Sequence, residues 1–110
     1  KYVREEKLLT LEEAIRKMAS LPADQFAFAD RGRLSAGTAA DVVVFDARTV
    51  GPGPLKRVND LPAGADRLVS QASGIDAVIV NGELIRRDNM DVFAANDKLP
   101  GRLLRSGRAA

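Results

Sequence analysis

Carboxylates are the side chains of this sequence best suited to chemistry. The chain has 110 residues and contains neither histidine nor cysteine. Without these residues it holds no zinc finger, no Ser-His-Asp or Cys-His nucleophile and no thiol redox centre. Asp41 and Asp46 flank a short apolar run, and Asp88, Asp91 and Asp97 gather near the end of the chain. Paired carboxylates can serve as general acid and base, or bind a hard cation through oxygen.

A structural role for these aspartates is the simpler interpretation, because Asp in turns and at strand ends accepts hydrogen bonds from local backbone amides. Ser70 and Ser73 lack a plausible base, and Tyr2 lies in a charged terminus. The run 51–54, Gly-Pro-Gly-Pro, does not fit a phosphate loop, since prolines stand where amides would have to face the anion. The residues themselves therefore favour structural roles over catalysis, metal binding or ligand binding.

Charge is distributed unevenly, although 17 basic and 15 acidic residues leave a formal net charge of only +2. The body is mildly acidic and the tail is basic, through Lys98, Arg102, Arg105 and Arg108. Nucleic-acid binding would rest on this tail alone, which lacks the interleaved aromatic residues and the broad basic face typical of such proteins. The sequence therefore argues against a nucleic-acid partner.

The clearest local element is an amphipathic helix predicted over residues 10–21. Thr10 followed by Glu13 is a capping box, in which each side chain accepts a hydrogen bond from the other residue's backbone amide. Apolar residues recur at helical spacing at Leu11, Ala14, Ile15 and Met18. Pro22 is expected to end this helix, and a shorter helical turn is expected to begin with Ser20 as its cap.

Beyond residue 30 the pattern changes to strands and turns. The run 41–46, Asp-Val-Val-Val-Phe-Asp, predicts a strand that is apolar on both faces and therefore covered on both sides. Asn81-Gly82 between the apolar runs 75–80 and 83–87 predicts a hairpin with a type I′ turn. The Gly/Pro-rich residues 51–74 predict a long irregular loop that is functional, mobile or laid against another part of the protein.

These elements predict an α+β fold, with an N-terminal amphipathic helix followed by a small antiparallel β-sheet. We divide the chain into a helical segment 1–29, a β portion 30–88 and a C-terminal extension 89–110 that is partly disordered and frayed beyond Arg105. The longest apolar run is far shorter than the ~20 residues that a bilayer requires. Nothing resembles a signal peptide, so we expect a soluble, cytoplasmic protein without a membrane partner. A first residue of Lys indicates a chain that was processed or cut from something longer.

Taken in order, several motifs resemble the carboxyl-terminal end of the D-aminoacylases, which are N-acyl-D-amino-acid deacylases of the amidohydrolase superfamily. The motifs are Tyr-Val-Arg-Glu at 2–5, Leu-Glu-Glu-Ala-Ile at 11–15, Gly-x-x-Ala-Asp-Val-Val-Val-Phe-Asp at 37–46, Val-Asn-Gly at 80–82 and Leu-Pro-Gly-Arg at 99–102. The resemblance covers nearly the whole chain and is weakest over residues 51–74.

The resemblance implies part of an enzyme rather than a whole one. Such enzymes hydrolyse the amide bond of N-acyl-D-amino acids at a metal site, expected to hold zinc, in a (β/α)₈ barrel. Residues 30–88 would be the C-terminal half of a composite β-sandwich beside that barrel, and the helix at 10–21 would lie against the barrel. The resemblance places no family site residue on this chain, so we assign it no catalytic, metal-binding or ligand-binding residue. Its partners would be the barrel and the N-terminal sandwich strands, with homo-oligomers possible. The alternative is a free-standing small β domain that acts as a protein-interaction module.

One departure from the family concerns Ala27, which stands where the family tends to have glycine. An alanine at positive φ would be strained by roughly 1 kcal/mol or more. We therefore predict that the turn is rebuilt with a negative φ at Ala27.

Overall fold

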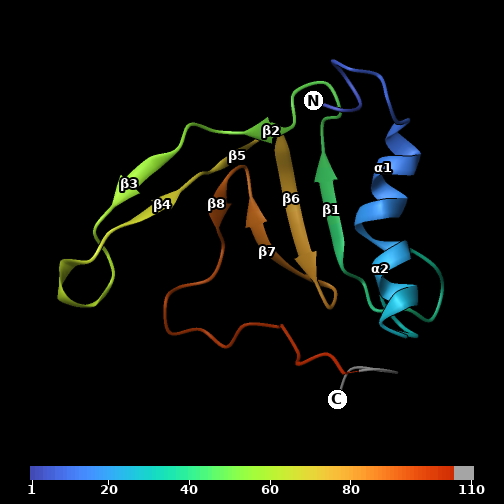
Figure 1. Cartoon of the computed structure of the whole chain (residues 1–110). Helices are drawn as coiled ribbons and strands as arrows, with labels where there is room; N and C mark the ends of the chain where they lie inside the picture. Colours follow the sequence, from blue (N-terminus) through green and yellow to red (C-terminus); the bar gives the residue numbers. More distant parts are fainter. Residues whose placement is uncertain (106–110) are drawn as a thin grey trace.

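Two short helices, an antiparallel sheet and a projecting two-stranded arm make up the computed structural model, which describes residues 1–105 (Figure 1). The helices are α1 (Leu11–Met18), α2 (Ser20–Gln25) and the 3₁₀ turn η1 (Pro62–Gly64). The strands are β1 (Val42–Phe45), β2 (Gly51–Pro52), β3 (Lys56–Val58), β4 (Arg67–Val69), β5 (Ala72–Ser73), β6 (Ile75–Val80), β7 (Glu83–Arg87) and β8 (Met90–Asp91). The predicted α+β class is confirmed. The fraying predicted beyond Arg105 falls outside the described residues.

Helix α1 begins as the capping box predicts. The Glu13 amide donates to the Thr10 hydroxyl at 3.2 Å, and the Thr10 amide donates to the Glu13 carboxylate at 3.1 Å. The predicted end at Pro22 is wrong, because α1 stops at Met18 and the chain bends at Ala19. Ala19 is also the cap of α2, without a side-chain bond, so the predicted Ser20 cap is wrong too. Pro22 lies in the first turn of α2, where no intrahelical N–H bond is lost.

Helix α2 ends at Gln25 with Phe26 as its C-cap, and the next residue, Ala27, has a φ of +56°, so the predicted negative φ is wrong. The Ala27 amide donates to the Asp24 carbonyl, and the Phe28 amide donates to the Ala23 carbonyl at 2.9 Å. This pair of bonds is a Schellman motif, which places the residue after the C-cap in the left-handed region. The two bonds, together with the Phe26–Phe28 ring contact, hold the turn in its glycine-type conformation although alanine occupies it.

Replacing Ala27 with Gly is expected to raise the free energy of unfolding of the polypeptide that contains this chain by about 1 kcal/mol, because glycine adopts positive φ without strain. Thermal unfolding measures the change. Ala14→Gly inside α1 is the matched control, and it should lower stability by about the same amount. A loss of stability in Ala27→Gly would contradict the motif.

The four-stranded sheet has the order β1-β6-β7-β8, with all neighbours antiparallel. The predicted hairpin is confirmed, since Asn81 (φ +49°) and Gly82 (φ +83°) supply the two positive φ values of a type I′ turn between β6 and β7. Strand β1 pairs with β6 along one side only, in the register Val43↔Val78. Within the described residues β1 is therefore an edge strand.

Residues 51–73 form a two-stranded arm, so the predicted irregular loop is wrong. Strand β2 pairs with β5 and β3 with β4, and the arm leads away from the sheet to its tip at η1 (Figure 1). Glycine at position 53 allows the two sides of the arm to approach each other closely. A Cβ on Gly53 would lie 2.6 Å from the Gln71 carbonyl oxygen. Arg67 binds Asp60 through two hydrogen bonds near the tip.

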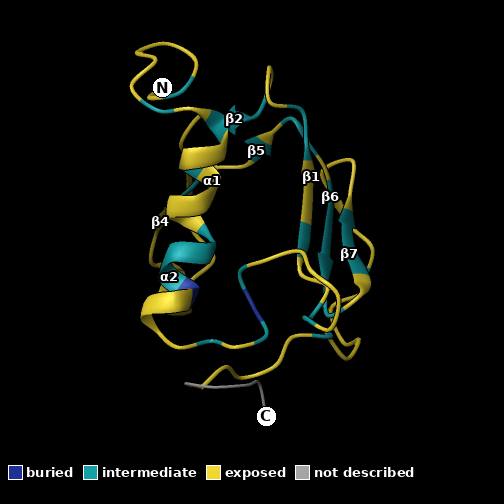
Figure 2. Cartoon of the chain, turned by 90° about the vertical axis from the view of Figure 1, so that its right-hand side faces the viewer, coloured by how far each residue is buried: buried dark blue, intermediate teal, exposed yellow. Residues whose placement is uncertain are grey.

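The described chain has almost no apolar core (Figure 2). Ala23 is the one apolar side chain classed as buried among residues 1–105, while Val43 and Val44 on the two faces of β1 are 51% and 45% exposed. The cover expected on both sides of this strand is not supplied by these residues. The surface area is 8586 Å², whereas a compact monomer of this mass exposes about 5,900 Å². The radius of gyration is 16.4 Å, against about 13 Å for a compact domain.

Candidate functional site

The aspartates that the sequence singles out do not converge on one site. Asp41 and Asp46 lie at opposite ends of β1. The Asp46 carboxylate accepts a hydrogen bond from the Arg48 backbone amide at 2.8 Å, which closes a local turn. Asp91 pairs with Arg86 across the β7–β8 ladder. The Asp46 contact is of the kind that the simpler interpretation expects, and the Asp91 ion pair is also structural.

The remaining candidates also make local contacts. The Asp97 carboxylate accepts a hydrogen bond from the Ala94 amide at 2.8 Å. Asp88 lies in the turn between β7 and β8 with φ +47°. Ser70 and Ser73 donate to carbonyl oxygens across the arm, those of Gly53 and Gly51. Tyr2 is 58% exposed. Nucleophilic and acid–base candidates are therefore scattered through the described residues rather than assembled.

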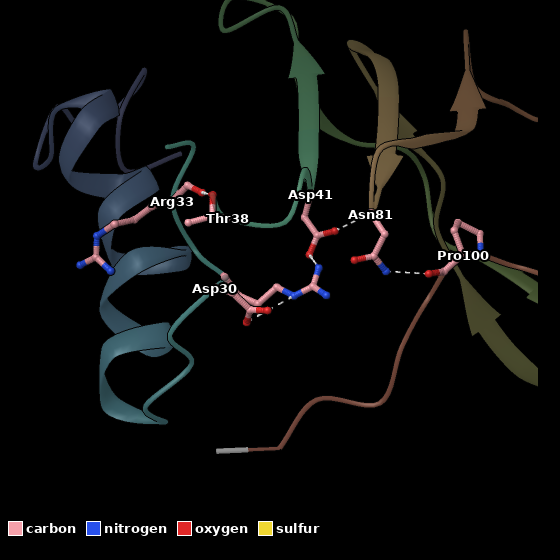
Figure 3. Close-up of polar contacts among 7 residues, drawn as sticks. Asp30, Arg33, Thr38, Asp41, Asn81 and Pro100 are labelled. Carbon is pink, nitrogen blue, oxygen red and sulfur yellow. Dashed lines mark hydrogen bonds and ion pairs between the residues drawn. The ribbon is translucent and has the colours of Figure 1, made fainter. Parts of the chain in front are cut away.

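Asp41 is the centre of a polar network that joins four segments (Figure 3). One carboxylate oxygen accepts a hydrogen bond from the Arg31 guanidinium at 2.5 Å, and the other accepts the Asn81 backbone amide at 2.8 Å. The Asn81 side chain then donates to the Pro100 carbonyl at 2.6 Å. This Asp41 network, comprising Arg31, Asp41, Asn81 and Pro100, ties the α2–β1 linker to β1, the β6–β7 turn and the C-terminal segment.

Arg31 is unusual because its charged side chain is only 8% exposed. The Arg31 Nε and one Asp30 carboxylate oxygen are buried without a hydrogen-bond partner, 4.0 Å apart. The next residue, Gly32, permits this burial, since a Cβ there would meet the Ala23 Cβ at 2.4 Å. A buried guanidinium depends on its carboxylate partner for stability. The Asp41 network therefore holds the fold together and offers no free group for chemistry.

The donor set does not fit a metal ion. No group of three or more His, Cys, Asp or Glu residues that could hold a metal occurs among residues 1–105. The chain lacks the imidazole and thiolate ligands that zinc favours. Its Asp41 and Asp46 carboxylates already accept hydrogen bonds from amides and arginines. No catalytic step can be derived through a metal held by these residues.

Several surface carboxyls have lowered pKa values because they accept hydrogen bonds. The Thr10 amide and hydroxyl lower the pKa of Glu13, and the guanidinium of Arg33 lowers the pKa of Asp24. The guanidinium of Arg67 does the same for the pKa of Asp60. A carboxyl whose pKa is lower in the folded state stabilises the fold above its unfolded pKa.

Acid is therefore expected to weaken the protein progressively as the pH falls below about 4. Protonation of Glu13, Asp24 and Asp60 removes their charge-assisted contacts as the pH passes through the lowered values. Denaturant unfolding between pH 7 and pH 3 measures this slope. Asp60→Asn should flatten part of it, and a stability that rises towards pH 3 would contradict the assignment.

A concave apolar surface lies between α1 and β1. It has a volume of about 600 Å³ and is lined almost wholly by apolar atoms. One wall is the apolar face of α1, with Leu11, Ile15 and Met18, and the other includes Val43 and Phe45 of β1. We call this surface the α1–β1 groove. Its lining also includes Lys1, Tyr2 and Lys17, but the surface that it exposes is almost wholly apolar, so the groove is an apolar contact surface.

Comparison with known proteins identifies the family. The model described as Amidohydrolase family matches residues 1–86. The chain belongs to the amidohydrolase family. An N-acyl-D-glutamate deacylase of Alcaligenes xylosoxydans xylosoxydans is 46% identical over 105 residues, which cover 96% of this chain and 19% of that protein. An N-acyl-D-aspartate deacylase of the same organism is 39% identical over 97% of this chain and 19% of its own length.

A solved structure agrees with these relatives. The crystal structure of D-aminoacylase has a TM-score of 0.63 to this amidohydrolase chain, with 31% sequence identity. The similarity covers 97% of this chain and 19% of that one. The resemblance to D-aminoacylases inferred from the motifs is thereby confirmed. The chain spans about a fifth of the length of the relatives that it matches.

Two features of this amidohydrolase chain escaped sequence reasoning, the buried Arg31 and the α1–β1 groove. The only local hint of the first is the Asp30-Arg31-Gly32 run, which reads as an ordinary turn. The groove is hinted at by the helical stripe of α1 and the two-sided apolar strand, but their juxtaposition is not local. Among the described residues, no helix has the length and apolar character needed to span a bilayer.

Proposed function

We propose that this chain is a non-catalytic, carboxyl-terminal part of a metal-dependent amidohydrolase that hydrolyses the amide bond of N-acyl-D-amino acids. The observation that supports the proposal is the share of each protein that the alignments cover. The match to two named deacylases extends over 96% and 97% of the chain, yet corresponds to only 19% of each relative. A segment that aligns almost entirely within a longer enzyme is best explained as part of such an enzyme.

The side chains of this chain indicate that the catalytic groups lie elsewhere in the polypeptide. The described residues offer no metal cluster, and their Asp41 and Asp46 carboxylates already accept hydrogen bonds from arginine side chains or backbone amides. The metal, for which we propose zinc, and the catalytic groups would therefore be supplied by a barrel outside residues 1–110. The chain's partners would be that barrel and the N-terminal strands that complete a β-sandwich. A chain without cysteine is compatible with the reducing cytoplasm, where we place the enzyme.

A free-standing interaction module is the second candidate, and the exposed α1–β1 groove is the observation that favours it. The lack of a buried apolar core argues against it, because an independent domain of this size needs one. Size-exclusion chromatography with light scattering, together with dye binding, tests this second candidate. A stable, compact 110-residue monomer that binds no hydrophobic dye would remove the large exposed patch on which this candidate depends.

The proposal is tested with the polypeptide encoded by the complete reading frame that contains residues 1–110, here called the complete polypeptide. It should hydrolyse N-acetyl-D-glutamate or N-acetyl-D-aspartate, the compounds suggested by the names of the relatives. The L-enantiomers are the matched control and should react far more slowly. A reading frame that encodes only these 110 residues, or a complete polypeptide that hydrolyses no N-acyl-D-amino acid, would contradict the proposal.

A further inference from the structure

The arm over residues 51–73 is a two-stranded ribbon that projects from the body of the chain. Its outer strands, β3 and β4, make their main contacts with each other, and neither joins the four-stranded sheet. Figure 1 shows the tip of the arm on the side of the molecule opposite α1. A two-stranded ribbon in water is marginally stable unless it packs on another element. The arm therefore needs a cover that the described residues do not provide.

One face of this ribbon carries exposed leucines. The register Arg57↔Leu68 places these two side chains on the same face. Leu55 and Asp66, each two residues earlier in its segment, continue the alternation onto that face. Leu55 is 71% exposed and Leu68 is 57% exposed. We call this surface, made of Leu55, Arg57, Asp66 and Leu68, the leucine face of the arm.

The leucine face is electrically neutral within its four residues. Arg57 forms an ion pair with Asp66 on this face. The neighbouring cation, Lys56, lies on the other face of the ribbon, where it stands beside Val69 in the register. A nucleic acid or an acidic protein binds through free cations, which the leucine face lacks. A second copy of the same face meets it without like-charge repulsion.

The edges of the arm are protected against the addition of a further strand. One edge carries Pro54, Lys56 and Arg57, and the other carries Arg67. Charges and prolines on an edge strand oppose pairing with another chain. Contact through a face is still open to the arm, because two ribbons can stack as β-sheets do, with their apolar side chains between them.

We propose that two copies of the complete polypeptide associate through the leucine faces of their arms, related by a two-fold axis. Leu55 and Leu68 of each copy pack against the same pair in the other, and the ion pairs of Arg57 with Asp66 lie at the rim. Two leucines per copy form a contact below the standard interface size, so the dimer is weak and depends on concentration. The proposal goes beyond the proposed function, since it requires no assumption about the reaction.

Analytical ultracentrifugation of the complete polypeptide tests the association. Its mass should rise from one copy to two as the protein concentration increases. Leu68→Asp should raise the dissociation constant of the dimer at least roughly 10-fold, because it brings two unpaired carboxylates together at the two-fold contact. Lys56→Asp, on the other face of the same ribbon, is the matched control and should leave the dimer intact. A polypeptide that stays monomeric throughout, or a dimer equally stable in Leu68→Asp, would overturn the inference.

Thiol labelling locates the contact independently, and it does not depend on the folding of Leu68→Asp. Residues 1–110 contain no cysteine, and mass spectrometry of labelled peptides identifies the position. The thiol of Leu55→Cys should react at least roughly 10-fold more slowly when the dimer predominates than after dilution, since burial permits reaction only after opening. The thiol of Lys56→Cys is the control and should react at the same rate at both concentrations. Protection of Leu55→Cys at every dilution would show that the same polypeptide covers the arm, and would overturn the inference.

The outcomes for the arm and for the reaction are separable. A monomeric polypeptide that hydrolyses N-acetyl-D-glutamate would overturn the inference alone. A dimer that is weakened by Leu68→Asp but has no deacylase activity would overturn the proposed function and leave the arm contact supported.

Discussion

Residues 1–110 expressed alone are expected to melt without a cooperative heat-absorption peak and to bind a hydrophobic dye, whereas the complete polypeptide melts cooperatively. The described residues bury a single apolar side chain, Ala23. The surface of 8586 Å² exceeds that of a compact monomer of this mass by about 2,700 Å². Cooperative unfolding of a small domain depends on a shared buried core, which residues 1–105 do not form on their own.

Scanning calorimetry and dye fluorescence of the isolated chain measure this difference. The enthalpy expected for a folded domain of this length is about 70 kcal/mol at the midpoint, so its absence is easily detected. The matched control is the complete polypeptide under the same conditions, which should bind little dye. A sharp transition of the isolated chain with that full enthalpy would contradict the conclusion that its core is completed by other residues.

Replacing Asp41 with Ala is expected to destabilise the complete polypeptide by about 2 to 3 kcal/mol, because it leaves a buried guanidinium without its partner. Arg31 is 8% exposed, and Asp41, at 40% exposed, is its closest carboxylate. The lower end of the usual range for broken buried pairs applies, since water reaches Asp41. The substitution also removes the acceptor of the Asn81 amide and so loosens the β6–β7 turn.

Asp46→Ala is the matched control, at the other end of the same strand. Asp46 contacts an arginine that is 89% exposed, so its loss should be clearly smaller. Denaturant unfolding of both variants gives the comparison. A second substitution, Arg31→Met in the Asp41→Ala background, should restore part of the lost stability, because it removes the unpaired buried charge. Equal losses in the two aspartate variants, with no recovery in the double variant, would contradict the network.

The elements that sequence reasoning predicted well are those whose cause is local. The Thr10–Glu13 capping box and the Asn81-Gly82 turn each act within a few residues, and both are present. Their hydrogen bonds or φ values are fixed by the residue types themselves. The start of α1 and the β6–β7 hairpin could therefore be placed before the structure was known.

The elements that were mispredicted depend on neighbours. Ala27 keeps a positive φ because two hydrogen bonds of the Schellman motif outweigh its strain. The arm over residues 51–73 forms because β3 pairs with β4, whose residues lie nine or more positions further along the chain. The Gly/Pro pattern of the sequence does not reveal this pairing. Pro22 reads as a helix stop but is equally suited to the first turn of a second helix.

The candidate site shows the same limit. The absence of His and Cys, together with scattered aspartates, favoured a segment without a catalytic centre of its own, and this stays a prediction for residues 1–110. The sequence indicated the two walls of the α1–β1 groove, the apolar stripe of the helix and the strand that is apolar on both faces, but not that they face each other. Which surface covers that strand depends on polypeptide beyond these residues, so neither the motif order nor the local pattern could locate it.

The most direct test of the account is to measure N-acetyl-D-glutamate hydrolysis by residues 1–110 and by the complete polypeptide, each with added zinc. The account predicts that the complete polypeptide hydrolyses the amide and that the 110 residues alone react no faster than buffer. Their carboxylates are held in local contacts, and they lack the usual zinc ligands. Zinc-dependent hydrolysis by the isolated 110 residues, or none by the complete polypeptide, would contradict it.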